Sequence, residues 1–98
     1  MSQTEHAAQA IAEQRAVIDR LNRELLVLLE ARGRAVELIM RIKEESGLAV
    51  LDPGREQRMI AELRAAAKGP YSADQIERVY RCILEISREL GERRRRSP

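Results

Sequence analysis

The sequence has no tryptophan or phenylalanine, and only two tyrosines, one cysteine and one histidine among its 98 residues. The single cysteine, Cys82, excludes an internal disulfide, and one histidine, His6, leaves no Cys/His set for a zinc site. So few aromatic rings argue against nucleic-acid binding by base stacking. No apolar run approaches the roughly 20 residues that span a bilayer, and no hydrophobic export segment follows the N-terminus. We therefore expect a soluble, cytoplasmic protein.

Positive charge is concentrated at the C-terminal end. Arg93 to Arg96 supply four of the 18 basic residues, and without them 14 basic residues accompany 16 acidic ones. The length allows one domain, with a core expected at 8–91 and a basic, disordered tail at 92–98. Such a tail is a solvated end or a contact for an anionic partner. Alone it would bind nucleic acid weakly, so neither nucleic acid nor a membrane is an expected partner.

The first half of the chain predicts one long helix. From Ala8 to about Ser46 it is rich in Ala, Leu, Glu and Arg and has no proline. The apolar residues recur at helical spacing in one stripe that keeps its phase across Gly33, which favours a continuous helix over a hairpin. The stripe comprises Ile11, Ile18, Leu21, Leu25, Leu28, Leu29, Val36, Ile39 and Ile42.

The length of this helix predicts a dimer. About 38 residues at 1.5 Å each span roughly 57 Å, whereas a compact domain of this size is not much more than about 35 Å across. The apolar stripe would then be exposed to water over much of its length. A second copy of the chain must cover it.

Two shorter helices complete an all-α fold. Gly47 can end the first helix, and Asp52-Pro53 is a typical N-cap and first helical residue. Met59, Ile60, Leu63 and Ala67 form the apolar side of the second helix, which Gly69-Pro70 ends. Ser72 and Gln75 form a capping box for the third helix, where Gly91 is the expected C-terminal cap. The expected inward face of that helix consists of Ile76, Val79, Tyr80, Ile83 and Leu90.

Three cations interrupt the apolar stripe. On a helical wheel Arg32 and Lys43 fall inside it and Arg15 on its edge, although burying an unpaired charge is costly. In one interpretation, the aliphatic carbons of these side chains cover the apolar stripe while their charged groups reach water. In the other, the three cations form a pocket for an anionic ligand, since arginine suits bidentate binding of carboxylates.

Two other positions join this group. Asp52-Pro53-Gly54-Arg55-Glu56 places another arginine and an acid at a helix start, where free amides add positive potential; alone, it reads as an ordinary helix start. Ser87 places a hydroxyl on the inward face of the third helix, where a bond back to its own helix is the simpler interpretation.

The spacing of Arg15, Arg32, Lys43, Asp52 and Arg55-Glu56 resembles that of the all-helical chorismate mutase family. The resemblance covers about residues 11–91, including the Leu-rich run to Glu30-Ala-Arg32 and the segment from Val50 to Glu56. It implies an intertwined homodimer of three helices per chain. Each of its two active sites would be lined mainly by one chain, with an arginine of the first helix contributed by the other.

The resemblance also implies a role for each site residue. Arg15 of the partner chain and Arg32 would hold the two carboxylates of chorismate, and Lys43 would donate to the ether oxygen. Glu56 and the backbone at Asp52 would hold the ring hydroxyl. Arg55 and Ser87 would complete the carboxylate end.

The implied chemistry suits the residues present. The [3,3] rearrangement of chorismate to prephenate needs a folded conformer and donors at the ether oxygen. It needs no nucleophile, general base, metal or cofactor, and we expect none. One position departs from the pattern, because Gly91 stands where the family has Gln or Glu as a second donor to the ether oxygen. Such a donor typically stabilises the transition state by about 3 kcal/mol.

The main prediction is a chorismate mutase of aromatic amino-acid biosynthesis. Isochorismate pyruvate-lyase and aminodeoxychorismate mutase activities of the same fold are alternatives, because each needs a similar binding site for a dianionic substrate. A mutase-like subunit that regulates a partner synthase of the shikimate pathway is another, which Gly91 and the arginine tail would fit. A plain helical dimerisation module without ligand is the last.

Overall fold

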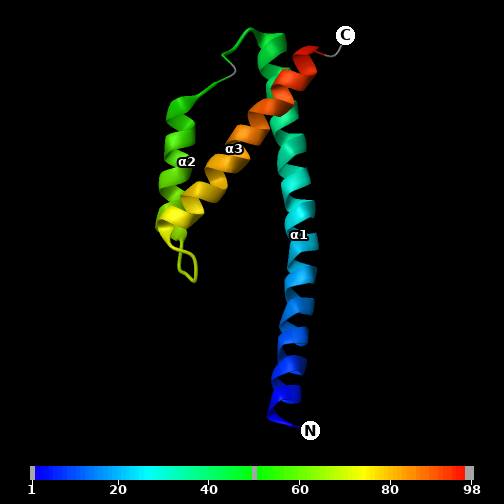
Figure 1. The fold of residues 1–98 in the computed structure, drawn as a ribbon. Coiled ribbons are helices and arrows are strands. Elements are labelled where there is room, and N and C mark those ends of the chain that lie inside the picture. Colours follow the sequence, from blue (N-terminus) through cyan, green and yellow to red (C-terminus); the bar gives the residue numbers. More distant parts are fainter. Residues whose placement is uncertain (1, 50, 97–98) are drawn as a thin grey trace. The chain divides into compact units, whose positions relative to one another are not determined.

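The computed structural model describes residues 2–49 and 51–96, which form three helices and no strand (Figure 1). The helices are α1 (Gln3–Ser46), α2 (Pro53–Ala66) and α3 (Ala73–Arg96). The predicted all-α class with a long first helix is therefore confirmed. The chain divides into two compact parts, Met1–Arg34 and Ala35–Pro98.

Helix α1 begins five residues before the predicted start at Ala8. The Oγ atom of Ser2 accepts a hydrogen bond from the amide of Glu5 at 3.1 Å, and the Ser2 carbonyl accepts one from the amide of His6 at 3.0 Å. Ser2 is thus the N-cap, and Ser-x-x-Glu is a recognisable capping sequence that the composition-based prediction overlooked. The helix continues through Gly33, as predicted.

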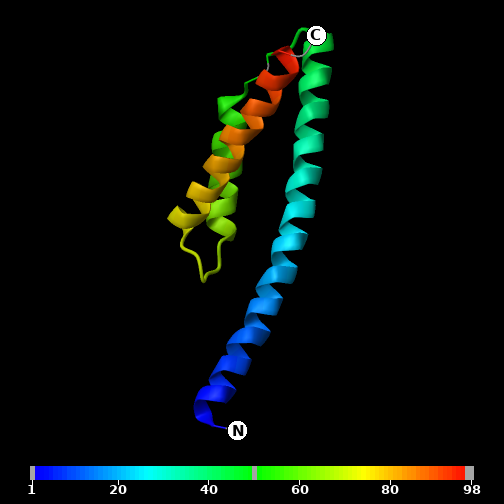
Figure 2. The ribbon, with the colours of Figure 1, turned by 45° about the vertical axis from the view of Figure 1, so that its right-hand side comes forward.

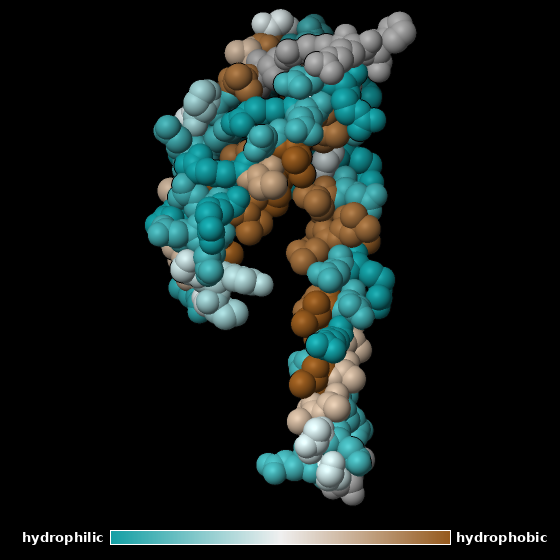
Figure 3. Space-filling view, in the orientation of Figure 1, coloured by the Kyte–Doolittle hydropathy of each residue, from teal (hydrophilic) through white to brown (hydrophobic). Residues whose placement is uncertain are grey.

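The apolar stripe of α1 is exposed. In the first part of the chain, Ile11, Ile18 and the leucines from Leu21 to Leu29 are 38–66% accessible to solvent. No residue of α1 is buried among those described. Figure 3 shows these apolar side chains in brown along the helix surface. Ordinary monomers seldom leave an apolar surface of this extent in water.

Helix α1 ends in a glycine cap. Gly47 has a φ of 68°, in the left-handed region that glycine adopts without strain. The amide of Leu48 donates to the Lys43 carbonyl at 2.9 Å and that of Gly47 to the Glu44 carbonyl at 3.4 Å. This pair of bonds is a Schellman motif, so the predicted stop at Gly47 is confirmed.

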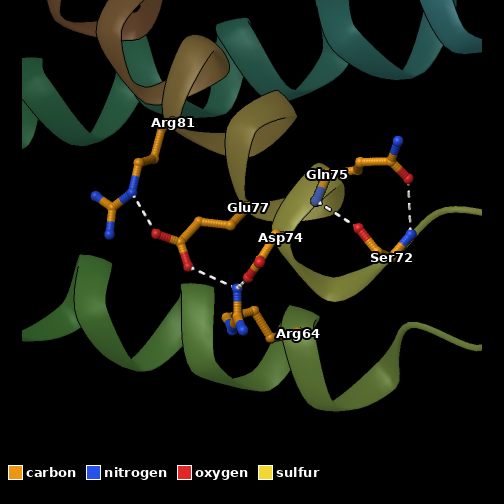
Figure 4. Close-up of polar contacts among 6 residues, drawn as sticks. All are labelled: Arg64, Ser72, Asp74, Gln75, Glu77 and Arg81. Carbon is orange, nitrogen blue, oxygen red and sulfur yellow. Dashed lines mark hydrogen bonds and ion pairs between the residues drawn. The ribbon is translucent and has the colours of Figure 1, made fainter.

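Both predicted N-caps of the shorter helices are present. Asp52 Oδ1 accepts from the amide of Arg55 at 3.1 Å at the start of α2. Before α3, Ser72 Oγ accepts from the Gln75 amide at 3.1 Å, and Gln75 Oε1 accepts from the Ser72 amide at 2.9 Å (Figure 4). These reciprocal bonds are the capping box that the sequence indicates.

Helices α2 and α3 pack side by side as a hairpin in the second part of the chain (Figure 2). Its best-buried apolar side chains are Ile60 and Leu84, with 5% and 8% accessible surface. Ile60 lies on the predicted apolar side of α2, whereas the sequence does not predict Leu84 on the inward face of α3. Val79, which the sequence predicts on that face, is exposed.

An ion-pair cluster closes the hairpin where α2 ends and α3 begins. Arg64 of α2 donates to Asp74 at 2.7 Å and to Glu77 at 3.0 Å, and Arg81 donates to Glu77 at 2.7 Å (Figure 4). The hydrogen bond from Arg81, with the charges of Arg81 and Arg64, lowers the pKa of Glu77. The hydrogen bond to Asp74 raises the pKa of Arg64 above its normal value.

Helix α3 runs to Arg96 and does not stop at Gly91. Gly91 lies inside the helix and has no positive φ, so its predicted role as a C-terminal cap is wrong. Residues 92–96 are helical, which corrects the expected disordered tail over that range. The side chains of 94–96 and residues 97–98 lie outside the described part.

Candidate functional site

The start of α2 carries three of the predicted site residues. The side chain of Asp52 caps the helix, and its carbonyl accepts from the Glu56 amide at 3.2 Å. Asp52 and Arg55 are exposed, and Glu56 is half-buried. Capping fixes the backbone of this turn, and therefore the point from which the Glu56 side chain departs.

Glu56 is tied to α3 by an arginine that the sequence did not single out. Arg88 Nη2 donates to Glu56 Oε2 at 2.7 Å, across 32 positions of sequence. No local spacing signals such a pair, because its partners lie on different helices. The structure therefore adds Arg88 to the surroundings of Glu56.

Ser87, the neighbour of Arg88, is half-buried and donates from Oγ to the Ile83 carbonyl at 2.6 Å. This is the bond back to its own helix that the sequence suggested. A hydroxyl has one proton to donate. To donate to a substrate carboxylate, the Ser87 hydroxyl would have to turn away from Ile83.

Lys43 lies in the last turn of α1 and is half-buried. A cation is favoured there because the carbonyl end of a helix carries partial negative charge. Arg15 and Arg32 belong to the first part of the chain, where Arg15 is exposed and Arg32 half-buried. Their convergence with Lys43, Glu56 and Ser87 on one ligand stays a prediction.

Gly91 lies one turn after Ser87 and is buried against the C-terminal part of α1. A Cβ atom at this position would lie 2.9 Å from both Sδ and Cε of Met40. Carbon and sulfur atoms in contact normally stay about 3.5–4.0 Å apart. The tip of Met40 therefore occupies the space into which any side chain at position 91 would project.

Among the residues that the structure describes, no group of three or more His, Cys, Asp or Glu side chains could hold a metal ion. Within the same residues, no helix is both long and apolar enough to cross a membrane.

The sequence profile of the family described as chorismate mutase type II matches residues 14–92, most of the chain. The chain belongs to the chorismate mutase type II family. The resemblance to this family that the sequence indicates is therefore confirmed.

Two solved structures of chorismate mutase from Thermus thermophilus are similar to this chain. Form II is 42% identical, covers 86% of this chain and 96% of its own, and superposes with a TM-score of 0.83. Form I is 41% identical, with 80% and 98% coverage and a TM-score of 0.78. Both matches extend over nearly the whole of the solved chains.

A curated relative, the T-protein of Haemophilus influenzae, is 38% identical over 80 residues. The match takes in 81% of this chain but only 21% of the T-protein. The chain thus corresponds to about a fifth of that relative's length.

Proposed function

We propose that this protein catalyses the rearrangement of chorismate to prephenate. The family match over 14–92, with 42% identity to a chorismate mutase across 96% of the solved chain, supports this proposal most strongly. In the reaction the ether C–O bond breaks while a C–C bond forms within the same molecule. No proton or group has to come from the protein, whose contribution is conformational and electrostatic.

The proposed roles follow the charges of the side chains. Arg32, and Arg15 from a second copy, bind the carboxylates, with Arg55 and Ser87 at the same end. Lys43 donates to the ether oxygen, where negative charge develops as the bond breaks. Glu56 and the backbone at Asp52 hold the ring hydroxyl. The half-burial of Arg32, Lys43 and Glu56 supports these roles, because partial exclusion of water strengthens charge interactions.

A homodimer is part of the proposal. The exposed stripe of α1 extends over several turns and has no buried residue among those described. A second copy of this apolar helix is the chemically matched cover, and it would bring Arg15 of one chain to the site of the other. The cytoplasmic location and a partner synthase stay predictions.

The test is conversion of chorismate by the purified protein, followed by the loss of its absorbance and the appearance of prephenate. Isochorismate, with release of pyruvate, and aminodeoxychorismate are assayed in parallel to separate the related activities. We expect turnover of chorismate. Turnover of isochorismate or aminodeoxychorismate alone would replace the proposed reaction by the corresponding one.

Arg32→Ala tests the binding of the carboxylates. Removing one such charged partner should lower kcat/KM by about 10²–10³-fold. Arg20→Ala is the matched control on the same helix, since Arg20 forms an exposed ion pair with Glu24 at 3.9 Å. Normal turnover by a folded Arg32→Ala protein would show that Arg32 does not bind substrate.

A further inference from the structure

We propose that Arg88 is a positioning residue that holds Glu56 ready for the ring hydroxyl of the substrate. This inference rests on the proposed function. Arg88 itself does not contact the reacting atoms in this scheme. It acts through the Glu56 carboxylate, and its effect should therefore depend on the presence of that hydroxyl.

The contact between Arg88 and Glu56 is short and charge-assisted. Nη2 donates to Oε2 at 2.7 Å, and the Glu56 side chain is only 27% accessible to solvent. Hydrogen bonds between ionised groups are about twice as strong as those between neutral groups. A carboxylate has two oxygens and about four acceptor positions, so the bond at Oε2 leaves Oε1 able to accept from a substrate.

The anchor matters because, among the described residues, the contacts at the start of α2 fix the backbone of Glu56 but not its side chain. The Asp52 cap holds the first turn of α2, but a glutamate side chain still has several rotatable bonds, and ordering it costs conformational entropy. Arg88 supplies the second point of attachment from α3. Because Arg88 orients the carboxylate before the substrate arrives, substrate binding does not have to overcome the entropic cost of ordering the Glu56 side chain.

The hairpin contains a natural control for a purely structural role. At its other end Arg64 joins α2 to α3 through Asp74 and Glu77, far along both helices from Glu56 and Arg88. Both arginines therefore connect the same two helices. Only Arg88 connects them through a carboxylate assigned to the substrate.

The experiment compares Arg88→Leu and Arg64→Leu on two substrates: chorismate and its analogue lacking the ring hydroxyl. We expect Arg88→Leu to raise KM for chorismate by roughly 10-fold. Its kcat should change much less, because the hydroxyl is held in the ground state and the transition state alike. For the deoxy analogue, KM should stay within about twofold of wild type. Arg64→Leu should affect both substrates equally.

Arg88→Lys provides a second measurement, and it tests the positioning role if Arg88→Leu does not fold. It keeps the charge but not the planar guanidinium, and it should recover part of the loss for chorismate alone. Equal effects on the two substrates, or no effect on either, in the folded variants would overturn the positioning role. A wild-type protein that converts neither substrate refutes the proposed function, and this inference with it.

Discussion

The contact between Gly91 and Met40 makes a quantitative prediction about coupling between α1 and α3. The perturbation is Gly91→Ala, made in the wild-type chain and in a Met40→Ala chain. Alanine inside a helix is favoured over glycine by about 1 kcal/mol, and Gly91 lies inside α3. In wild type, however, the new methyl group would start 2.9 Å from Met40 Sδ and Cε.

The size of the effect follows from that distance. The Met40 tip must withdraw by up to about 1 Å to reach an ordinary contact. Because methionine is flexible, the cost should lie at the low end of overpacking, about 1 kcal/mol. Gly91→Ala should thus be nearly neutral in wild type. It should stabilise the Met40→Ala chain by about 1 kcal/mol, a coupling energy of about the same size.

Urea unfolding of the four proteins at one fixed concentration measures this coupling, since an associating chain has a concentration-dependent stability. The same cycle with Gly91→Gln tests activity. On the proposed mechanism, Gly91→Gln should increase chorismate turnover by about 10-fold once Met40→Ala has vacated the space. Gly91→Gln alone should gain less.

Additive stabilities in this cycle would refute the reasoning, because they would mean that Met40 does not restrict position 91. An equal gain in turnover from Gly91→Gln with and without Met40→Ala would carry the same meaning. No gain in either background would show that a glutamine at 91 does not reach the ether oxygen.

Three further predictions concern assembly, the shared site and pH. Sedimentation equilibrium should give about 22 kDa, twice the chain mass of 11.2 kDa; a folded monomer would contradict the dimer. Mixing inactive Arg15→Ala and Arg32→Ala chains should restore activity, because half of the sites in a heterodimer then contain both arginines; no recovery would exclude sharing between chains. Because the pKa of Glu77 is lowered in the folded protein, its ionised carboxylate stabilises the fold at pH values above the pKa that Glu77 has in the unfolded chain. This stabilisation is lost as the pH falls through the pKa that Glu77 has in the folded chain. Thermal stability should therefore fall less steeply on acidification in Glu77→Gln than in wild type, and equal slopes would contradict the effect assigned to Arg81.

Local sequence determined where most helices begin and end. The caps at Asp52 and Ser72–Gln75 and the stop at Gly47 rest on hydrogen bonds between residues three to five positions apart. Such bonds form within one short segment, whatever the rest of the chain does. The same locality made the back-bonded Ser87 predictable.

Tertiary structure decided the features that join separate segments. The pair of Glu56 and Arg88 spans 32 positions, and nothing near either residue specifies the other. Gly91 reads as a helix stop in sequence, yet α3 passes through it, and the tip of Met40 from α1 packs where a side chain at this position would project. The spacing of the charged residues predicts which of them bind a substrate, but which of them meet depends on how the helices pack.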